Sequence, residues 1–220
     1  MATKQKKADF RGSHQAWVDA AYSTLVSTGI DAVTINYLAK KLKISRTSFY
    51  WVFKDRDSIL AALLERWRAR NTESIVRQAA QYATSVAEAT LNVFDCWFDP
   101  GLFDAGLEFA VRSWAHQSAK VANEVTLSDA QRLDALKAMY QRFGHDALES
   151  DIRARATYLI QLGYITTRAK EDFAFRMQRI PLYCEICSGT KPSESEMKRF
   201  YARRNFSWRN SQSKLVMDSH

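Results

Sequence analysis

The residues of this sequence with the clearest chemical potential are three neighbours, Arg46, Thr47 and Ser48. All three carry hydrogen-bonding groups at the start of one short segment. An arginine can donate two hydrogen bonds to O6 and N7 of a guanine, and a threonine or serine can contact a base edge or the methyl group of a thymine. Residue types in this order indicate a surface that could read the edges of DNA bases.

Further hydrogen-bond donors follow shortly after these three residues, at Tyr50, Trp51, Lys54 and Arg56. Their hydroxyl, indole and cationic groups suit phosphate oxygens, which position a protein on a duplex without reading its sequence. Trp51 is equally compatible with a half-buried packing role, so its contact with DNA is one of two alternatives.

Short helices must hold these side chains in place. Thr34 precedes apolar residues that recur at helical spacing and is expected to cap their helix, which Lys43 then ends in a tight turn. Ser45 is expected to cap a third helix that turns its apolar side inward, and Asp55 a fourth. The expected helices are 10–28, 34–42, a short one from Ser45 that buries Phe49, Val52 and Phe53, and one from Asp55 to about residue 80.

Two short helices across a tight turn, with another helix behind them, are the design of a helix-turn-helix. The second helix of this unit enters the major groove of DNA by its N-terminal end. Ala39 is small at the point where the two short helices approach each other. The alternative is an ordinary helical hairpin of a bundle, which explains neither the basic residues nor the order of the caps.

Around this unit the sequence resembles the tetracycline-repressor (TetR) family of bacterial transcription factors. The resemblance rests on T-I-x-x-L-A-x-x-L-x-I-S at 34–45 and S-F-Y-x-x-F-x-x-R-D-x-I-L at 48–60. It covers about residues 10–68. It implies a bacterial, cytoplasmic regulator with an N-terminal DNA-binding domain over 1–70 and a larger helical domain for ligand binding and dimerisation over 71–220.

The resemblance also assigns roles to single residues. The family's phosphate-contacting threonine, tyrosine and basic residue correspond to Thr34, Tyr50 and Arg56. Its base-reading positions correspond to the three neighbours at 46–48. The residues expected to contact DNA are therefore Thr34, Asn36, Arg46, Thr47, Ser48, Tyr50, Trp51, Lys54 and Arg56.

Two positions depart from the family pattern. Lys43 stands where members often have glycine, so we expect a non-glycine residue with a positive φ there. Val52 stands where members often have histidine or tyrosine, so one phosphate contact is expected to be missing.

Composition agrees with a helical, DNA-binding protein. The 220 residues include only seven glycines and three prolines, too few for the frequent turns of strand-rich folds. Residues 1–70 hold 13 Lys/Arg against 6 Asp/Glu, whereas residues 71–220 hold 19 against 18. This basic segment suggests an anionic partner, with nucleic acid first, although a solvated basic face is the alternative on charge alone.

The sequence disfavours several classes of protein. No apolar run is long enough to span a bilayer, the basic start is not followed by the apolar run of a secretory signal, and three cysteines do not suit a disulfide framework. We therefore expect a soluble protein of a reducing cytosol, without a membrane partner. G-x-S-x-G, H-E-x-x-H and G-x-G-x-x-G motifs are absent, so we expect no enzyme, metal site or cofactor.

Beyond residue 80 the sequence shows only helical signals, so the predicted fold class is all-α. The expected helices are 84–97, Asp99 to about 116 with Pro100 in the first turn, 119–143, 149–169, 172–188 with Pro181 inside it, and 193–207. Following the resemblance, we assign the dimer interface to about 150–169 and 172–188. The first of these has a stripe of apolar and small residues, namely Ile152, Ala156, Leu159, Ile160, Gly163 and Tyr164.

The second domain is rich in aromatic residues that could line a pocket for an apolar or aromatic effector, although core packing is the alternative for each. Arg112 and His116 share one helix face and could meet a ligand carboxylate or form a salt bridge. The expected pocket residues are Phe94, Trp97, Phe98, Phe109, Arg112, Trp114, His116, Tyr140, Phe143 and Tyr158.

The sequence therefore predicts a ligand-responsive regulator, a repressor by family default, that binds a near-palindromic site on double-stranded DNA as a homodimer. An unidentified small molecule would release it. One alternative is a helical protein–protein adaptor. Another is a redox-sensing regulator that uses Cys184 and Cys187, although the apolar residues around them favour buried structural thiols.

Overall fold

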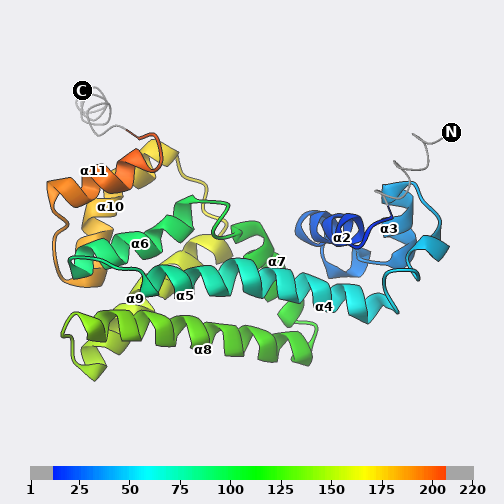
Figure 1. The fold of residues 1–220 in the computed structure, drawn as a ribbon, viewed down its shortest axis with the longest axis horizontal. Coiled ribbons are helices and arrows are strands. Elements are labelled where there is room, and N and C mark those ends of the chain that lie inside the picture. The colour runs from blue at the N-terminus through cyan, green and yellow to red at the C-terminus, as the bar shows by residue number, and fades with distance from the viewer. Residues whose placement is uncertain (1–11, 207–220) are drawn as a thin grey trace. The chain divides into compact units, whose positions relative to one another are not determined.

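The computed structural model describes residues 12–206 and consists of helices and connecting turns, with no strand in that range (Figure 1). The all-α fold class is confirmed. The helices are α2 (His14–Thr28), α3 (Ile35–Leu42), α4 (Arg56–Trp67), α5 (Glu73–Ala80), α6 (Val86–Phe98), α7 (Ala105–Ala115), α8 (Ala119–Arg142), α9 (Ala147–Thr166), α10 (Phe173–Ser188) and α11 (Glu194–Ala202). Short 3₁₀ turns lie at Ile30–Ala32 (η1) and Arg46–Ser48 (η2), and a π-helical turn lies at Arg68–Thr72 (η3).

The chain divides into two compact units. The first contains the described residues up to Asn71 together with Asp104–Ser128, and the second contains Thr72–Phe103 with the described residues from Asp129 onward. The first unit thus gains α7 and the start of α8, because α7 packs against the apolar sides of α2 and α4. The division of functions between 1–70 and 71–220 stays a prediction.

The first unit has a hydrophobic core to which all of its helices contribute. Trp17 of α2, Leu63 of α4 and Leu107 of α7 are fully buried in one cluster. Phe49, from the segment after η2, is buried in the same cluster. The polar segment that carries the DNA-facing candidates is therefore fixed to the core by its own aromatic residue.

A buried carboxylate lies beside this core. Glu108 of α7 is 0% exposed, and its Oε2 accepts hydrogen bonds from Trp67 Nε1 (2.6 Å) and Asn71 Nδ2 (2.8 Å). Its Oε1 accepts from Arg112 Nε at 2.9 Å. Burying a carboxylate away from water costs free energy unless hydrogen-bond donors surround it. These contacts therefore hold the end of α4 against α7.

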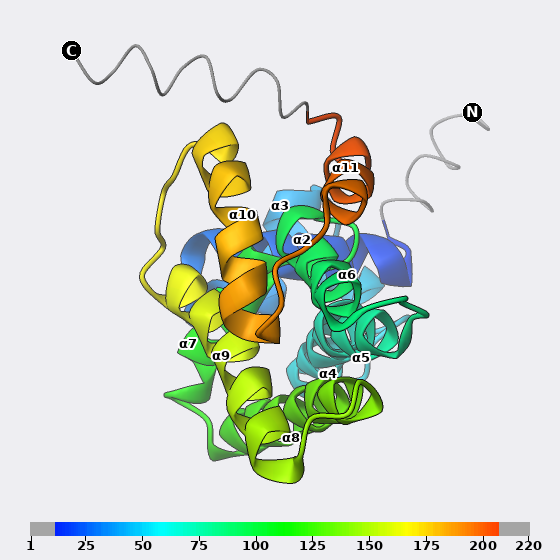
Figure 2. The ribbon, with the colours of Figure 1, turned by 90° about the vertical axis from the view of Figure 1, so that its left-hand side faces the viewer.

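The second unit is built around α6. Helices α10 and α11 pack against α6, and α9 packs against α10 (Figure 2). The apolar cluster between α6, α10 and α11 includes Phe94, Ile180 and Phe200. A separate polar centre surrounds Arg132, which donates to Thr72 Oγ1 (3.0 Å) and to the Tyr158 hydroxyl (2.7 Å).

Several expected helix boundaries are wrong. The helix expected from Asp99 begins instead at Ala105, where Asp104 caps it by accepting from Leu107 N–H at 2.9 Å. Asp99 forms a turn of its own, since its carboxylate accepts from Gly101 N–H at 2.7 Å. The expected helix at 149–169 begins at Ala147 and ends at Thr166. The helix expected over 193–207 ends at Ala202, and the one expected from residue 10 begins at His14. Residues 10, 11 and 207 of these helices lie outside the described residues.

The remaining helices follow the expected pattern more closely. Helical residues continue from Arg56 to Ala80, with the π-helical turn inside this stretch, and α10 runs through Pro181 as expected. Among residues 12–206, no helix combines the length and the hydropathy required to cross a membrane.

We predict that Glu108→Ala lowers the free energy of unfolding by about 3–5 kcal/mol, because it leaves the indole and amide donors buried without their acceptor. Urea denaturation of the purified variant measures this loss. The matched control is Glu65→Ala, which removes an exposed carboxylate paired with Arg68 and should cost less than about 1 kcal/mol. Equal losses of unfolding free energy in the two variants would show that Glu108 contributes no more to stability than an exposed carboxylate does.

Candidate nucleic-acid interface

Helix α3 begins and ends with the capping features that its sequence predicts. Thr34 Oγ1 accepts a hydrogen bond from Tyr37 N–H at 3.2 Å. Lys43 adopts the left-handed conformation at φ 58° and ψ 45°, so the expected positive φ is confirmed. Its N–H donates to Lys40 O and that of Ile44 donates to Ala39 O, a pair of bonds that ends the helix and starts the turn.

The segment after this turn differs from the expected third helix. Only Arg46–Ser48 is helical, as the 3₁₀ turn η2, and the residues that follow form further turns. Ser45 makes no side-chain cap. Instead, Ser48 Oγ donates to Ser45 O at 2.6 Å. Serine and threonine side chains compete with the helical backbone for hydrogen bonds, and the following aromatic and β-branched residues are weak helix formers.

Buried aromatic residues hold this short segment in place. The Phe49 ring meets the Trp17 ring edge-on at 5.1 Å between centroids, and it stacks on the Phe53 ring at 5.4 Å. Both phenylalanines are buried, as expected. Their neighbours must then point outward, and Tyr50 is exposed while Trp51 is 81% exposed. Because the Trp51 side chain is so exposed, the half-buried packing role that its sequence position left open is disfavoured.

Six of the nine residues expected to contact DNA line one surface hollow of the first unit. They come from the start of α3, from η2 and its following turn, and from the start of α4. The lining residues are Thr34, Ile35, Asn36, Arg46, Thr47, Tyr50 and Arg56. Of the other three, Ser48 is partly buried, whereas Trp51 and Lys54 are exposed outside the hollow.

A hydrogen bond across this hollow orients its central arginine. Arg46 Nη1 donates to Asn36 Oδ1 at 3.1 Å, which links η2 to α3. A guanidinium group has five N–H donors, so one bond to Asn36 leaves donors for another partner. Asn36 thus acts as a positioning residue for Arg46, which the sequence spacing did not indicate.

Arg56 has a structural role that sequence reasoning missed. Its Nε donates to Val33 O at 2.7 Å and its Nη2 donates to Ile30 O at 3.1 Å. These bonds fix the start of α4 to the backbone that leads into α3. The contact of Arg56 with phosphate stays a prediction. The two carbonyl partners lie more than twenty residues earlier in the chain, so no local pattern could indicate them.

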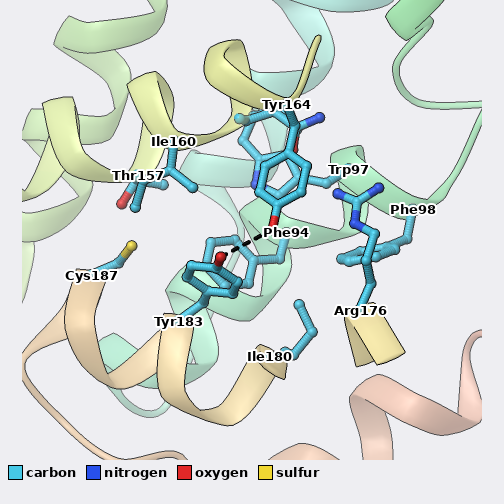
Figure 3. Close-up of a pocket in the computed structure, with 11 residues that line it drawn as sticks. Phe94, Trp97, Phe98, Thr157, Ile160, Tyr164, Arg176, Ile180, Tyr183 and Cys187 are labelled. Carbon is cyan, nitrogen blue, oxygen red and sulfur yellow. Dashed lines mark hydrogen bonds between the residues drawn. The ribbon is translucent and has the colours of Figure 1, made fainter. Parts of the chain in front are cut away.

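A second hollow lies in the second unit, between α6, α9 and α10 (Figure 3). Three of the ten residues expected in a ligand pocket line it, namely Phe94, Trp97 and Phe98. The remaining wall comes from residues that sequence reasoning did not select, which are Thr157, Ile160, Gln161, Tyr164, Arg176, Ile180, Tyr183 and Cys187.

The other seven expected pocket residues lie elsewhere. Phe109, Arg112, Trp114 and His116 belong to the first unit. There Arg112 forms an ion pair with Glu108, one of the two roles that the sequence left open, and His116 is exposed. In the second unit, Tyr158 bonds to Arg132 and Asp129, Tyr140 bonds to Thr157, and Phe143 lies beside Arg142.

The two cysteines at the end of α10 are buried and form no disulfide. Burial raises the pKa of the Cys184 thiol to about 12 and also raises that of Cys187. The thiolate is the reactive form of cysteine, so this environment disfavours redox chemistry. The buried structural role agrees with Cys184 Sγ donating to Ala87 O at 3.5 Å.

Helices α9 and α10 carry exposed apolar side chains. Ile152 and Leu159, seven residues apart on α9, are 58% and 53% exposed, and Leu182 and Ile186 on α10 are similarly exposed. Of the other stripe residues on α9, Gly163 is exposed, Ala156 is partly buried, and Ile160 and Tyr164 line the hollow. Exposed apolar side chains on both helices agree with the dimer interface expected there, which stays a prediction.

We predict that Arg56→Ala lowers the free energy of unfolding by about 1–3 kcal/mol, since Val33 O loses the guanidinium donor and Ile30 O keeps only the Val33 N–H. Thermal or urea denaturation in the absence of DNA measures the effect. Lys54→Ala is the matched control, because it removes an exposed cation two residues away and should change stability little. A neutral Arg56→Ala substitution would contradict the structural role assigned to these two bonds.

The comparisons with known proteins agree with this geometry. A family model described as bacterial regulatory proteins of the tetR family matches residues 18–63. The chain is 30% identical over 92 residues to YdeS of Bacillus subtilis, an uncharacterized HTH-type transcriptional regulator, a match that covers 40% of this chain and 46% of that protein.

Two further relatives match over a shorter stretch. They are the class D tetracycline repressor protein of Escherichia coli and the class H protein of Photobacterium damsela. Each is 38% identical over 61 residues, which is 28% of either chain. The chain therefore matches less than half the length of these relatives. No solved structure matches the chain.

Proposed function

We propose that the chain, whose residues 18–63 match the model of the tetR family of bacterial regulatory proteins, is a transcriptional regulator that binds a specific DNA operator as a homodimer and is released from it by a small molecule. The observation that carries this proposal is the hollow of the first unit. It gathers polar side chains from α3, η2 and α4 on one exposed surface.

The proposed DNA contacts divide into two kinds. Arg46, Thr47 and Ser48 read base edges, with Arg46 held toward them by Asn36. Thr34, Tyr50, Trp51, Lys54 and Arg56 face phosphates, which set the register of the protein on the duplex. The exposure of Tyr50, Trp51 and Lys54 supports these roles.

The proposed dimer forms through α9 and α10. Their exposed apolar residues, Ile152, Leu159, Leu182 and Ile186, would pack against the same residues of a second copy in a two-fold interface. Two heads related in this way bind a near-palindromic site with half-sites about 34–36 Å apart.

The second unit is proposed to hold the effector. Its hollow is lined by aromatic side chains from α6 and α9, as ligand pockets commonly are. For release, the effector must bind the DNA-incompetent conformation more tightly than the competent one. Operator DNA must then weaken effector binding by the same factor.

The DNA-binding proposal is tested by selecting duplexes from random DNA with the purified protein and measuring their affinity at several salt concentrations. Affinity should fall as salt rises, as counterion release requires. Arg46→Ala should lose about 1–3 kcal/mol on the selected site and relax preference at one base pair. Lys198→Ala, an exposed cation on α11, is the control and should bind normally. Failure to select any sequence would contradict the proposal.

The dimer proposal is tested by light scattering at micromolar concentration. Leu159→Asp should shift the protein from dimer to monomer, because a charge would be buried at the centre of the interface. Leu127→Asp is the matched control, since Leu127 is also exposed (58%) but lies on α8. A wild-type monomer, or a dimer that survives Leu159→Asp, would place the interface elsewhere or remove it.

A further inference from the structure

Arg176 is the cationic side chain among the residues that line the hollow of the second unit. Its guanidinium carbon lies 4.7 Å from the centroid of the Phe98 ring and 4.8 Å from that of the Tyr164 ring. Figure 3 shows the guanidinium group beside both rings. Contacts with ring faces leave the N–H edge of a guanidinium available, and this edge matches the two oxygens of a carboxylate.

No carboxylate within residues 12–206 takes this place. Arg176 forms neither an ion pair nor a hydrogen bond with a described residue, although burial lowers its pKa. Glu171 acts on it electrostatically, but the Glu171 carboxylate is paired with Arg179 at 2.5 Å. Two guanidinium groups thus share one carboxylate, and the hollow keeps an excess of positive charge. A partly buried cation in this situation is stabilised by an added anion.

A second polar group at the hollow also has no partner in the described chain. Gln161 of α9 lines the hollow and is only 6% exposed, yet its side-chain amide forms no hydrogen bond with another residue among 12–206. Its amide atoms remain accessible to water, so they can bond to a ligand that enters the hollow. In the same hollow, the Tyr164 and Tyr183 hydroxyls are bonded to each other at 3.0 Å (Figure 3).

The rest of the wall is apolar and largely aromatic. Phe94 and Trp97 come from α6, and Ile180 comes from α10. Aromatic walls favour a flat apolar body, which stacks against ring faces or meets their edges. The hollow measures only about 30 Å³, so its walls must move apart to admit a ligand. We propose that it then binds a small aromatic carboxylic acid, with its carboxylate on Arg176, a polar contact to Gln161 and its ring beside Phe94 and Trp97. This inference rests on the proposed function, since the acid would be the effector.

The first test compares two probes of equal size on the wild-type protein by calorimetry, phenylacetate and the neutral phenylacetamide. A charged hydrogen bond to Arg176 should make phenylacetate bind about 10- to 100-fold more tightly. Equal affinities, or binding of neither probe, would overturn the proposal. This comparison needs no variant and so does not depend on how a substitution folds.

The second test assigns the preference to Arg176. Arg176→Gln should reduce the affinity for phenylacetate to that for phenylacetamide and leave the affinity for phenylacetamide unchanged. Arg176→Lys should keep part of the preference, because a lysine retains the charge but not the planar fork. Lys198→Gln is the matched control, since it removes an exposed cation of the same unit outside the hollow. A preference that survives Arg176→Gln would place the anion site elsewhere and overturn the proposal.

A parallel titration with the selected operator separates this inference from the function on which it rests. DNA binding without any preference for the acid would refute the inference and leave the regulator intact. A preference for the acid without DNA binding would support the site and refute the regulator.

Discussion

The first unit depends on one buried carboxylate. Glu108 has no access to water, so its oxygens must keep the donors that Trp67, Asn71 and Arg112 supply. This requirement holds the end of α4 to α7. The start of α4 is held separately, where Arg56 bonds to the carbonyls before α3. With both ends tied, α4 fixes the backbone from which the helix-turn-helix begins, and the hollow of polar side chains keeps its shape.

Local features of the sequence predicted most of the fold. N-caps such as Thr34 and Asp55 carry their signal within four residues. The positive φ of Lys43 was expected from the family resemblance, because members often have glycine at that position. Six of the residues expected to contact DNA line one hollow because they lie close together in sequence. The short length of η2 was not predicted, because small energy differences decide whether serine side chains or the helical backbone form the local hydrogen bonds.

The second hollow could be predicted only in part. Phe94, Trp97 and Phe98 share one aromatic-rich stretch, which made α6 a visible candidate wall. Arg176 and Gln161 carry no such signal, because a polar residue on an amphipathic helix looks the same whether it faces solvent or a hollow. We expected Arg112 instead to bind a ligand carboxylate, because it shares a helix face with His116. In the structure Arg112 pairs with Glu108, four residues earlier in the same helix. Contacts between distant segments thus shape the hollow, whereas the role of Arg112 is set by a local ion pair.

The first unit is discontinuous along the chain, and this has a consequence for its synthesis. Its two parts are separated by the whole of Thr72–Phe103, and the second ends at Ser128. At translation rates of about 5–20 residues per second, roughly 2 to 9 s pass between the emergence of Asn71 and that of Ala115, the end of α7. During that interval the apolar side of α4, including Leu63, has no α7 to cover it. A nascent chain in this state is a natural client for a holdase chaperone, although its helix-turn-helix segment is already fully translated.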